Sequence, residues 1–359
     1  MSCVNRDGIR VGIVGIGFGQ QVLVPAFRLV PKFRVTAVAA SSLQRAERIR
    51  SRLGLELAFG DWRALVESNM IDAIAVAVPP SFQPTVIRAG LNAGKPIFCE
   101  KPVAADFANA LDVCEHVDRV GLPNMVDFWM PELPVWRQII ELLLSGEIGP
   151  IRHVAVQWNM ETYDIRQQKI SWKCLPEQGG GVLNSFVSHV LHYLELLFGP
   201  IDRIGCVLDG APDLSGWVET LALLNGYFAT GVPFAVSASS HTVHGNGHRL
   251  EIHGRHRTVV LENSDYDHAG GFKLWIGEKR SRNLREVGPS EAAVDHSIDG
   301  RIVPVSALLG RFGEWIETGS SSVPSLAQGL RVQALLNTAR MSFAGKGVMR
   351  SVPIGGQVR

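Results

Sequence analysis

The sequence predicts an α/β protein, in which a doubly wound parallel sheet is followed by a second α/β domain with a mostly antiparallel sheet. Up to about residue 120, short apolar runs alternate with glycine turns and helical segments. Runs that are apolar on both faces indicate parallel strands covered by helices on both sides. The remainder has longer strand-like segments separated by turn residues rather than by regular helices, which favours antiparallel pairing.

The N-terminal segments repeat the order strand, turn, helix. Glycine directly after a helix, as at Gly54 and Gly121, is a common left-handed end. Because doubly wound sheets bind ligands beyond the carboxyl ends of their strands, candidate sites lie at the first glycine turn, at Pro79-Pro80 and at Glu100-Lys101-Pro102. The predicted strands are Ile9–Val14, Arg34–Ala40, Ile71–Val78 and Ile97–Cys99, and the helices that follow them are Gln21–Leu29, Leu43–Arg52, Pro84–Asn92 and Phe107–Val120.

The second part of the chain begins around Asn124–Asp127. A chain of 359 residues exceeds one ordinary core. We therefore expect two domains, residues 1–126 and residues 127–359, and the last helix can pack back on the first domain. The predicted strands of the second domain are Ile151–Asn159, Leu221–Phe228, Phe234–Ser240, Ile252–Leu261 and Phe272–Ile276, with helices near Val182–Phe198 and Ala327–Ala344.

The composition excludes several classes of protein. With 46% hydrophobic and 19% charged residues, the chain has the balance of a compact globular protein. Its 35 basic and 34 acidic residues leave a net charge of +1, so neither nucleic acid nor a membrane surface is an expected partner. The apolar runs are too short to span a bilayer, and no secretory signal is recognisable. Five scattered cysteines favour a reducing, cytoplasmic setting over disulfides.

A glycine turn, Gly15-Ile16-Gly17-Phe18-Gly19-Gln20, follows the first strand. Glycine lets the backbone approach a pyrophosphate, and the helix behind it presents free N–H groups and a positive dipole end. Gly15 and Gly17 fit the first two positions of the dinucleotide fingerprint, whereas Gln20 stands where the last glycine is usual. Such a turn can serve chain geometry alone, but its position directly after a strand favours nucleotide binding.

The end of the second strand discriminates between the two nicotinamide cofactors. NAD sites usually hold the ribose 2′-hydroxyl with a carboxylate at this point. Here the chain has Ser41 and Ser42 followed by Arg45, with no acid before Glu47. Hydroxyl groups and a guanidinium suit a 2′-phosphate, so we expect NADP(H) to be preferred over NAD(H). If Arg45 is a solvated helix residue instead, NAD(H) is the alternative.

Four motifs occur in one order: the glycine turn, Pro79-Pro80, Glu100-Lys101-Pro102, and Gly179-Gly180-Gly181-Val182-Leu183 followed by His189. This set resembles the glucose–fructose oxidoreductase and inositol dehydrogenase family (Gfo/Idh/MocA) over nearly the whole chain. The resemblance implies a Rossmann domain and a C-terminal α/β domain with an open antiparallel sheet. It also implies NAD(P)-dependent oxidation or reduction at a carbinol carbon of a sugar, sugar derivative or cyclic polyol, in a homodimer or homotetramer formed through that sheet.

The same resemblance assigns the chemistry to Lys101 and His189. A lysine at the carboxyl end of a buried strand loses hydration, which lowers the pKa of its ammonium and makes proton exchange with an alcohol feasible near neutral pH. His189 would share that proton transfer, and Glu100 resembles the residue that helps to hold the nicotinamide end. The alternatives are a structural Lys-Pro turn, a histidine satisfied in the core, and an acidic charge at the start of the next helix.

Three positions depart from the family pattern. Ser185 stands where an aspartate is frequent, His192 where an acid is frequent, and Gln83 where a histidine is frequent. The missing aspartate would orient the proton-transfer residues and stabilise their charged forms. The alternative function is therefore a catalytically silent nucleotide-binding regulator or scaffold on the same fold.

Two further groups of residues complete the sequence-based interpretation. The segment Glu161–Lys173 carries aromatic and basic side chains that suit a polyhydroxylated or anionic substrate. Strand alternation would scatter the histidines between residues 241 and 256 over both faces of a sheet, so we expect no metal site.

The prediction is therefore an NADP(H)-preferring dehydrogenase or reductase that acts on CH–OH groups. Its expected catalytic residues are Lys101 and His189. Its expected cofactor-binding residues are Gly15, Gly17, Phe18, Gly19, Gln20, Ser41, Ser42, Arg45, Pro79, Pro80, Gln83, Glu100 and Lys101. Its candidate substrate contacts are Tyr163, Arg166, Trp172, Lys173, Ser185 and His192.

Overall fold

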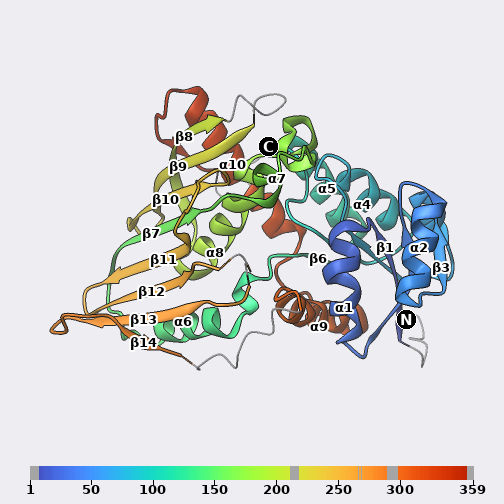
Figure 1. Cartoon of the computed structure of the whole chain (residues 1–359), viewed down its shortest axis with the longest axis horizontal. Coiled ribbons are helices and arrows are strands. Elements are labelled where there is room, and N and C mark those ends of the chain that lie inside the picture. The colour runs from blue at the N-terminus through green and yellow to red at the C-terminus, as the bar shows by residue number, and fades with distance from the viewer. Residues whose placement is uncertain (1–7, 211–217, 266, 268, 289–297, 354–359) are drawn as a thin grey trace. The chain divides into compact units, whose positions relative to one another are not determined.

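A computed structural model describes residues 8–210, 218–265, 267, 269–288 and 298–353 of the chain (Figure 1). The chain forms two compact units, Met1–Trp129 with Arg301–Leu330, and Met130–Gly300 with Arg331–Arg359. The sequence predicts domains of residues 1–126 and 127–359, with the last helix able to pack back on the first domain. In the structure, the first unit also includes residues 301–330.

The first unit contains a six-stranded parallel sheet with the strand order β3-β2-β1-β4-β5-β6. This is the Rossmann order, in which successive strands are added on one side of β1 as far as β3 and then on its other side from β4, so that a crevice lies at the carboxyl ends of β1 and β4. Every residue of the central β4 is buried, as expected for a strand covered on both faces. The strands are β1 (Ile9–Val14), β2 (Phe33–Ala39), β3 (Leu57–Phe59), β4 (Ala73–Val76), β5 (Ile97–Cys99) and β6 (Asn124–Val126).

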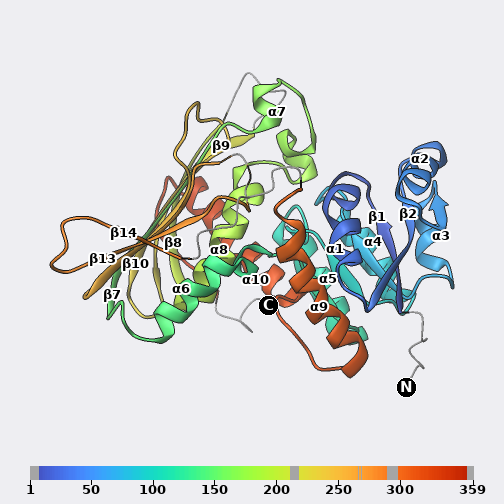
Figure 2. The same cartoon turned by 60° about the horizontal axis from the view of Figure 1, so that its bottom comes forward.

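Helices connect these strands and cover the sheet. A π-helical turn, η1 (Gly19–Leu23), runs directly into α1 (Val24–Arg28). The ring of Phe312 on α9 (Ile302–Thr318) lies 6.0 Å from the rings of Phe33 and Phe98, which explains why this late segment belongs to the first unit. Figure 2 shows α9 beside α1. The other helices of this unit are α2 (Leu43–Leu53), α3 (Trp62–Glu67), α4 (Gln83–Asn92) and α5 (Phe107–Val120).

The second unit contains a nine-stranded sheet with the order β14-β13-β12-β11-β7-β10-β9-β8-β15. Neighbouring strands are antiparallel except for β10 and β7, which are parallel. One prediction was wrong, because the run Ile252–Leu261 is not a single strand: it crosses a turn between β11 and β12. The strands are β7 (Ile151–Asn159), β8 (Ile201–Gly210), β9 (Glu219–Phe228), β10 (Pro233–Ser239), β11 (Gly247–Gly254), β12 (Arg257–Asn263), β13 (Lys273–Glu278), β14 (Arg285–Val287) and β15 (Arg350–Ser351).

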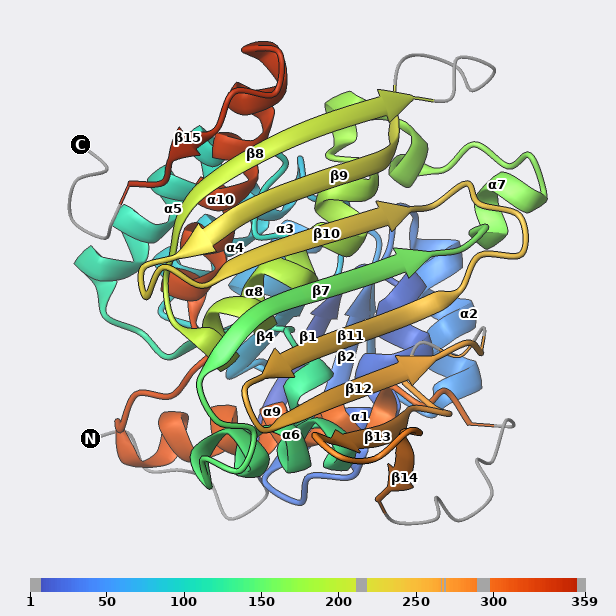
Figure 3. The same cartoon turned by 90° about the vertical axis from the view of Figure 1, so that its left-hand side faces the viewer.

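Helices lie on one face of this second sheet, and Figure 3 shows the opposite face toward the viewer. Burial alternates along β9 and β10, so one face of each strand packs into the unit while the other is more accessible. The predicted α/β class, with one parallel sheet and one mostly antiparallel sheet, is confirmed. The longer helices are α6 (Pro134–Leu144), α8 (Ser188–Phe198) and α10 (Leu326–Ala344); shorter turns are η2 (Met130–Glu132), α7 (Tyr163–Arg166), η3 (Trp172–Cys174), η4 (Pro176–Gln178) and η5 (Leu183–Val187).

The described part of the chain contains neither a candidate membrane-spanning helix nor a disulfide. None of its helices has the length and apolar character needed to cross a membrane. The cysteines at positions 99, 114, 174 and 206 are buried and unpaired with one another, while Cys3 lies outside the described residues.

Candidate active site

The glycine turn after β1 is shaped by contacts that only glycine allows. Gly15 has a φ of +102°, and a Cβ at this position would collide with the carbonyl oxygen of Ala77. A Cβ at Gly19 would come within 2.9 Å of Ile13, so this glycine lets the helix pack closely on β1. Around Gly17, by contrast, no atom lies within 4 Å of a would-be Cβ. The turn therefore offers an open backbone surface at the start of a helix, which fits the pyrophosphate of a dinucleotide.

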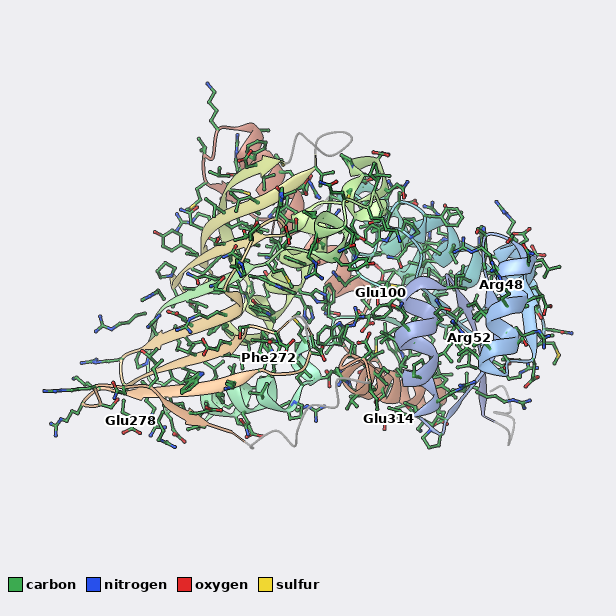
Figure 4. The ribbon with its side chains drawn as sticks, in the orientation of Figure 1. Arg48, Arg52, Glu100, Phe272, Glu278 and Glu314 are labelled. Atoms are coloured by element: carbon green, nitrogen blue, oxygen red, sulfur yellow. The ribbon has the colours of Figure 1, made fainter. Side chains whose placement is uncertain are left out.

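Gln20 takes no part in the close packing of this turn. Its Oε1 accepts a hydrogen bond from Arg52, which projects from α2 (Figure 4). In the usual fingerprint, the last glycine lets the helix pack closely on the strand. Here Gly19 has that role, although position 20 is a glutamine.

After the end of β2, Arg45 lies beside Ser41 and Ser42, the two serines that are predicted to bind the cofactor. Its Nη1 donates to Oγ of Ser41 at 2.9 Å, and Ser42 caps α2 by accepting from the backbone N–H of Arg45 at 3.3 Å. All three residues are exposed. The guanidinium is therefore held close to the carboxyl end of β2, where a ribose 2′-substituent is expected in this fold.

The turn that carries Lys101 is clamped by Gln83. This glutamine is 0% exposed, and its Nε2 donates to the carbonyl oxygens of Glu100 at 2.8 Å and of Pro102 at 2.6 Å. One amide thus holds the backbone on both sides of Lys101, whose peptide bond to Pro102 is cis. The sequence predicts Gln83 as a cofactor contact, and in the structure its amide nitrogen faces this turn. Gln83 is the first residue of α4, and its backbone N–H donates to the carbonyl oxygen of Pro79 at 3.2 Å, in the turn before the helix.

Beside this turn, two carboxyl groups meet in the interior. Glu100 (labelled in Figure 4) follows β5 and Asp127 follows the neighbouring β6. Asp127 is 0% exposed. Burial raises the pKa of both carboxyls, and the proximity of Glu100 raises that of Asp127 further, to well above its ordinary value. Lys101 and Arg301 act in the opposite direction on both pKa values.

Arg301 is a residue that the sequence interpretation missed. Its guanidinium carbon lies 5.0 Å from the ring centroid of Phe18, inside the glycine turn. The segment before α9 thus supplies a cation to the same edge of the sheet that carries the glycine turn and Lys101. No sequence pattern marks this arginine, because it lies far along the chain from both.

In the second unit, the triple glycine builds the approach to His189. Gly181 has a φ of +97°, and a Cβ there would strike the carboxylate of Glu219. That carboxylate accepts from the backbone N–H of Leu183, and its burial raises its pKa. The chain then enters η5 and α8, where His189 is 6% exposed.

The two positions near His189 at which the family often has an acid, 185 and 192, carry no acid in this chain. Oγ of Ser185 donates to the carbonyl oxygen of Gly181 at 2.8 Å, so this hydroxyl closes the turn. Burial lowers the pKa of His192 to about 3, which keeps its imidazole neutral at physiological pH. Neither side chain supplies the negative charge that the family pattern often has here.

A stack of aromatic rings lies beside His189. Trp158 stacks between Phe186 and His248, with ring centroids 4.5 Å and 4.3 Å away. Its ring centroid is 6.1 Å from that of His189. Oη of Tyr193 lies 3.1 Å from Nε2 of His248. This stack fixes the position of α8 on the sheet, and with it the imidazole of His189.

The segment that is predicted to contact the substrate, Glu161–Lys173, packs on the triple glycine that precedes His189. Gly181 donates its backbone N–H to the carbonyl oxygen of Lys173 at 2.9 Å, so Trp172 and Lys173 are tied to the segment that leads to His189. Asp164 organises the loop by accepting from Oγ of Ser171 at 2.9 Å, and its Oδ2 lies 3.8 Å from Nζ of Lys173. Tyr163 and Arg166 are exposed on α7.

The structure thus gathers the predicted residues into two groups. The cofactor candidates and Lys101 lie beyond the carboxyl ends of the neighbouring strands β2, β1, β4 and β5 of the first unit. His189, Ser185, Trp172 and Lys173 cluster in the second unit. Within the described ranges, no three His, Cys, Asp or Glu side chains form a group able to hold a metal ion.

Comparison with known proteins identifies the family. Residues 9–128 match the oxidoreductase family with an NAD-binding Rossmann fold, and residues 136–260 match the GFO/IDH/MocA C-terminal domain. The chain belongs to the Gfo/Idh/MocA family of oxidoreductases. The predicted family membership and the NAD(P)-binding Rossmann domain are thereby confirmed.

Several members of this family are similar to the chain. Levoglucosan dehydrogenase from Pseudarthrobacter phenanthrenivorans is 24% identical in an alignment that covers 97% of this chain and 99% of that protein. A dTDP-3,4-didehydro-2,6-dideoxy-alpha-D-glucose 3-reductase from Actinomadura kijaniata is 31% identical over 225 residues, or 61% of this chain and 65% of that protein.

Solved structures share the fold. A levoglucosan dehydrogenase in complex with NADH and levoglucosan superposes with a TM-score of 0.87 at 21% identity, covering 97% of this chain and 100% of that one. A 3-ketoreductase from Actinomadura kijaniata in complex with NADP and TDP-benzene has a TM-score of 0.78 at 22% identity and covers 93% of this chain and 98% of that one.

Proposed function

We propose that this oxidoreductase prefers NADP(H) and transfers a hydride between the nicotinamide and a carbinol or keto carbon of a sugar, sugar derivative or cyclic polyol. The observation that carries the proposal is the clamped turn at the carboxyl end of β5, in which Gln83 fixes the backbone on both sides of Lys101. A fixed lysine at this edge of a Rossmann sheet suits proton exchange with a substrate hydroxyl.

Each residue has a separate role in the proposed reaction. The bound dinucleotide supplies the hydride donor or acceptor. The open backbone at Gly17 binds the pyrophosphate. During oxidation, Nζ of Lys101 takes the proton from the reacting hydroxyl, and during reduction it returns that proton. The family pattern assigns to His189 the hydrogen bond that would orient the reacting hydroxyl, a role that an imidazole suits.

The substrate class is supported by the relatives and by the second unit. Two relatives are named for sugar substrates, levoglucosan dehydrogenase and a dideoxy-sugar 3-reductase. Trp172 offers an aromatic surface and Lys173 a cation next to the segment that leads to His189. An absorbance assay at the nicotinamide band over a panel of sugars, sugar derivatives and cyclic polyols tests this proposal. Turnover of none of them by a cofactor-saturated enzyme would contradict it.

Cofactor preference depends on Arg45 in this proposal. We expect Arg45→Ala to weaken NADP binding about 10-fold or more, because a charge-assisted hydrogen bond to the 2′-phosphate is lost, and to leave NAD binding nearly unchanged. Arg48→Ala on the same helix is the matched control and is expected to change neither affinity (Figure 4). Titration by isothermal calorimetry measures both, and equal losses for the two cofactors would refute the assignment.

A regulator without catalytic activity is the second candidate. It is favoured by Ser185, whose hydroxyl closes the turn at Gly181 instead of supplying an acid. Tight cofactor binding without turnover of any substrate in the panel would support it. The fixed lysine favours the enzyme, since a nucleotide sensor does not need a proton-exchange group.

We also propose that the chain forms a homodimer or homotetramer through the accessible face of the second sheet. Val207 on β8 and Leu223 on β9 are opposite each other in the register and are 53% and 43% exposed. Apolar side chains paired in this way favour contact with a second copy. Sedimentation equilibrium that gave the mass of a single chain would exclude such an assembly.

A further inference from the structure

The buried carboxyls of Glu100 and Asp127 are too close to act independently. Their strands β5 and β6 are parallel neighbours, with Cys99 opposite Val126, and each acid is the next residue after its strand. The backbone N–H of Asp127 donates to the carbonyl oxygen of Cys99 at 2.9 Å, which fixes the start of its side chain. Adjacent positions on neighbouring parallel strands bring the two carboxyls together, and the Glu100 carboxyl contributes to the raised pKa of Asp127.

Donors for these oxygens are scarce. The backbone N–H of Lys101 donates to Oε2 of Glu100 at 3.2 Å. Among the described residues, no N–H donor reaches Oε1 of Glu100 or either carboxyl oxygen of Asp127, and all three atoms are buried. Two ionised carboxylates would leave these oxygens charged and without a donor, which is costly in an interior. One retained proton supplies an O–H donor between the two groups.

The charged and titratable groups around the pair are few. Lys101 follows Glu100 directly, Arg301 approaches from the segment before α9, and the thiol of Cys99 lies at the end of β5. Burial raises the pKa of Cys99 well above its ordinary value, so the thiol stays neutral. Lys101 and Arg301 lower the pKa of both carboxyls, and their combined positive charge favours one ionised carboxyl in the pair.

We propose that Glu100 and Asp127 share one proton, and that the single negative charge they retain fixes the protonation of Lys101. Asp127 is then a positioning residue of the reaction, an inference that rests on the proposed function. During oxidation the O–H bond of the substrate would break and an N–H bond would form at Nζ of Lys101, while a C=O bond would replace the C–H bond whose hydride a bound nicotinamide would accept. The carboxyl pair keeps its own proton throughout, so its charge stays constant while that of Lys101 changes.

Two substitutions at Asp127 separate charge from structure. In Asp127→Asn, the new amide donates to Glu100, which becomes fully ionised, so the charge beside Lys101 is still −1. In Asp127→Leu, Glu100 loses the O–H group that stabilises its ionised form, so its pKa rises and the negative charge beside Lys101 is reduced. The pH at which the oxidation rate reaches half of its maximum is therefore expected to be unchanged in Asp127→Asn. In Asp127→Leu it is expected to move down by about one pH unit or more.

Infrared spectroscopy of the whole protein tests the shared proton without any substrate. The C=O stretch of a buried protonated carboxyl should be present in the wild type, absent in Asp127→Asn and present in Asp127→Leu. Asp106→Asn, an exposed helix cap in the same unit, is the matched control and should keep the wild-type spectrum and pH profile.

Each result decides the inference separately from the proposed function. Absence of the infrared band in the wild type would overturn the shared proton whether or not the protein is an enzyme. Presence of the band without turnover of any substrate would contradict the proposed function and leave the shared proton standing. An enzyme whose pH profile moves in neither variant, or equally in both, would show that Asp127 has only a structural role. If both variants fail to fold, the wild-type band and its loss in Glu100→Gln decide the point.

Discussion

Lys101→Ala is expected to lower kcat by about 10²–10⁴-fold, the contribution typical of a positioned proton-transfer group. The affinity for NADP(H) should stay within a few fold of the wild type, because the pyrophosphate and 2′-phosphate are held by the glycine turn and by Arg45. Steady-state kinetics with the best substrate of the panel measures kcat, and fluorescence titration of the reduced cofactor measures its Kd.

The matched variants for this prediction are Lys101→Met and Lys279→Ala. Lys101→Met keeps the aliphatic stem and removes only the ammonium, so it should be as inactive as Lys101→Ala. Lys279 is an exposed lysine beyond β13, and its alanine variant should retain full activity. Unchanged turnover in either Lys101 variant would remove this residue from the mechanism.

The first unit could be predicted largely from the sequence because its strands are buried on both faces. Runs such as Ile9–Val14 are almost continuously apolar and end in glycine or proline, so both their type and their ends are readable. β3 (Leu57–Phe59) and β6 (Asn124–Val126) were missed because three residues carry no usable period. The second unit was read less well: Gly254 at the end of β11 marks a turn inside a run that otherwise looks like one strand.

The candidate site was predictable where a motif carries it and hidden where tertiary packing creates it. Glu100 and Lys101 belong to a short motif, whereas Asp127 follows a strand with no recognisable pattern and Arg301 comes from a distant segment. Their association depends on strand order and on the return of α9 to the first unit. Gln83 was placed near the site by its position after Pro79-Pro80, but its partners are backbone carbonyls, which no side-chain pattern can reveal.

Gln83→Leu is expected to have the largest effect on stability. Leucine fills nearly the same volume but leaves the carbonyls of Glu100 and Pro102 without their shared donor in the interior. Each buried acceptor left unsatisfied costs about 1–3 kcal/mol, so the free energy of unfolding should fall by about 2–5 kcal/mol. Chemical denaturation followed by circular dichroism measures this loss, and Gln44→Leu on the exposed face of α2 is the control.

The same substitution should affect catalysis more than its distance from the reacting atoms suggests. Once the turn is released, Nζ of Lys101 is no longer held in one place, and a displacement of about 1 Å in a reacting group can cost about 10²-fold in rate. Gln83→His retains one N–H donor and should recover part of both the stability and kcat. A Gln83→Leu enzyme that loses stability but keeps its kcat would mean that the clamp serves folding alone, and that Lys101 is positioned by other contacts.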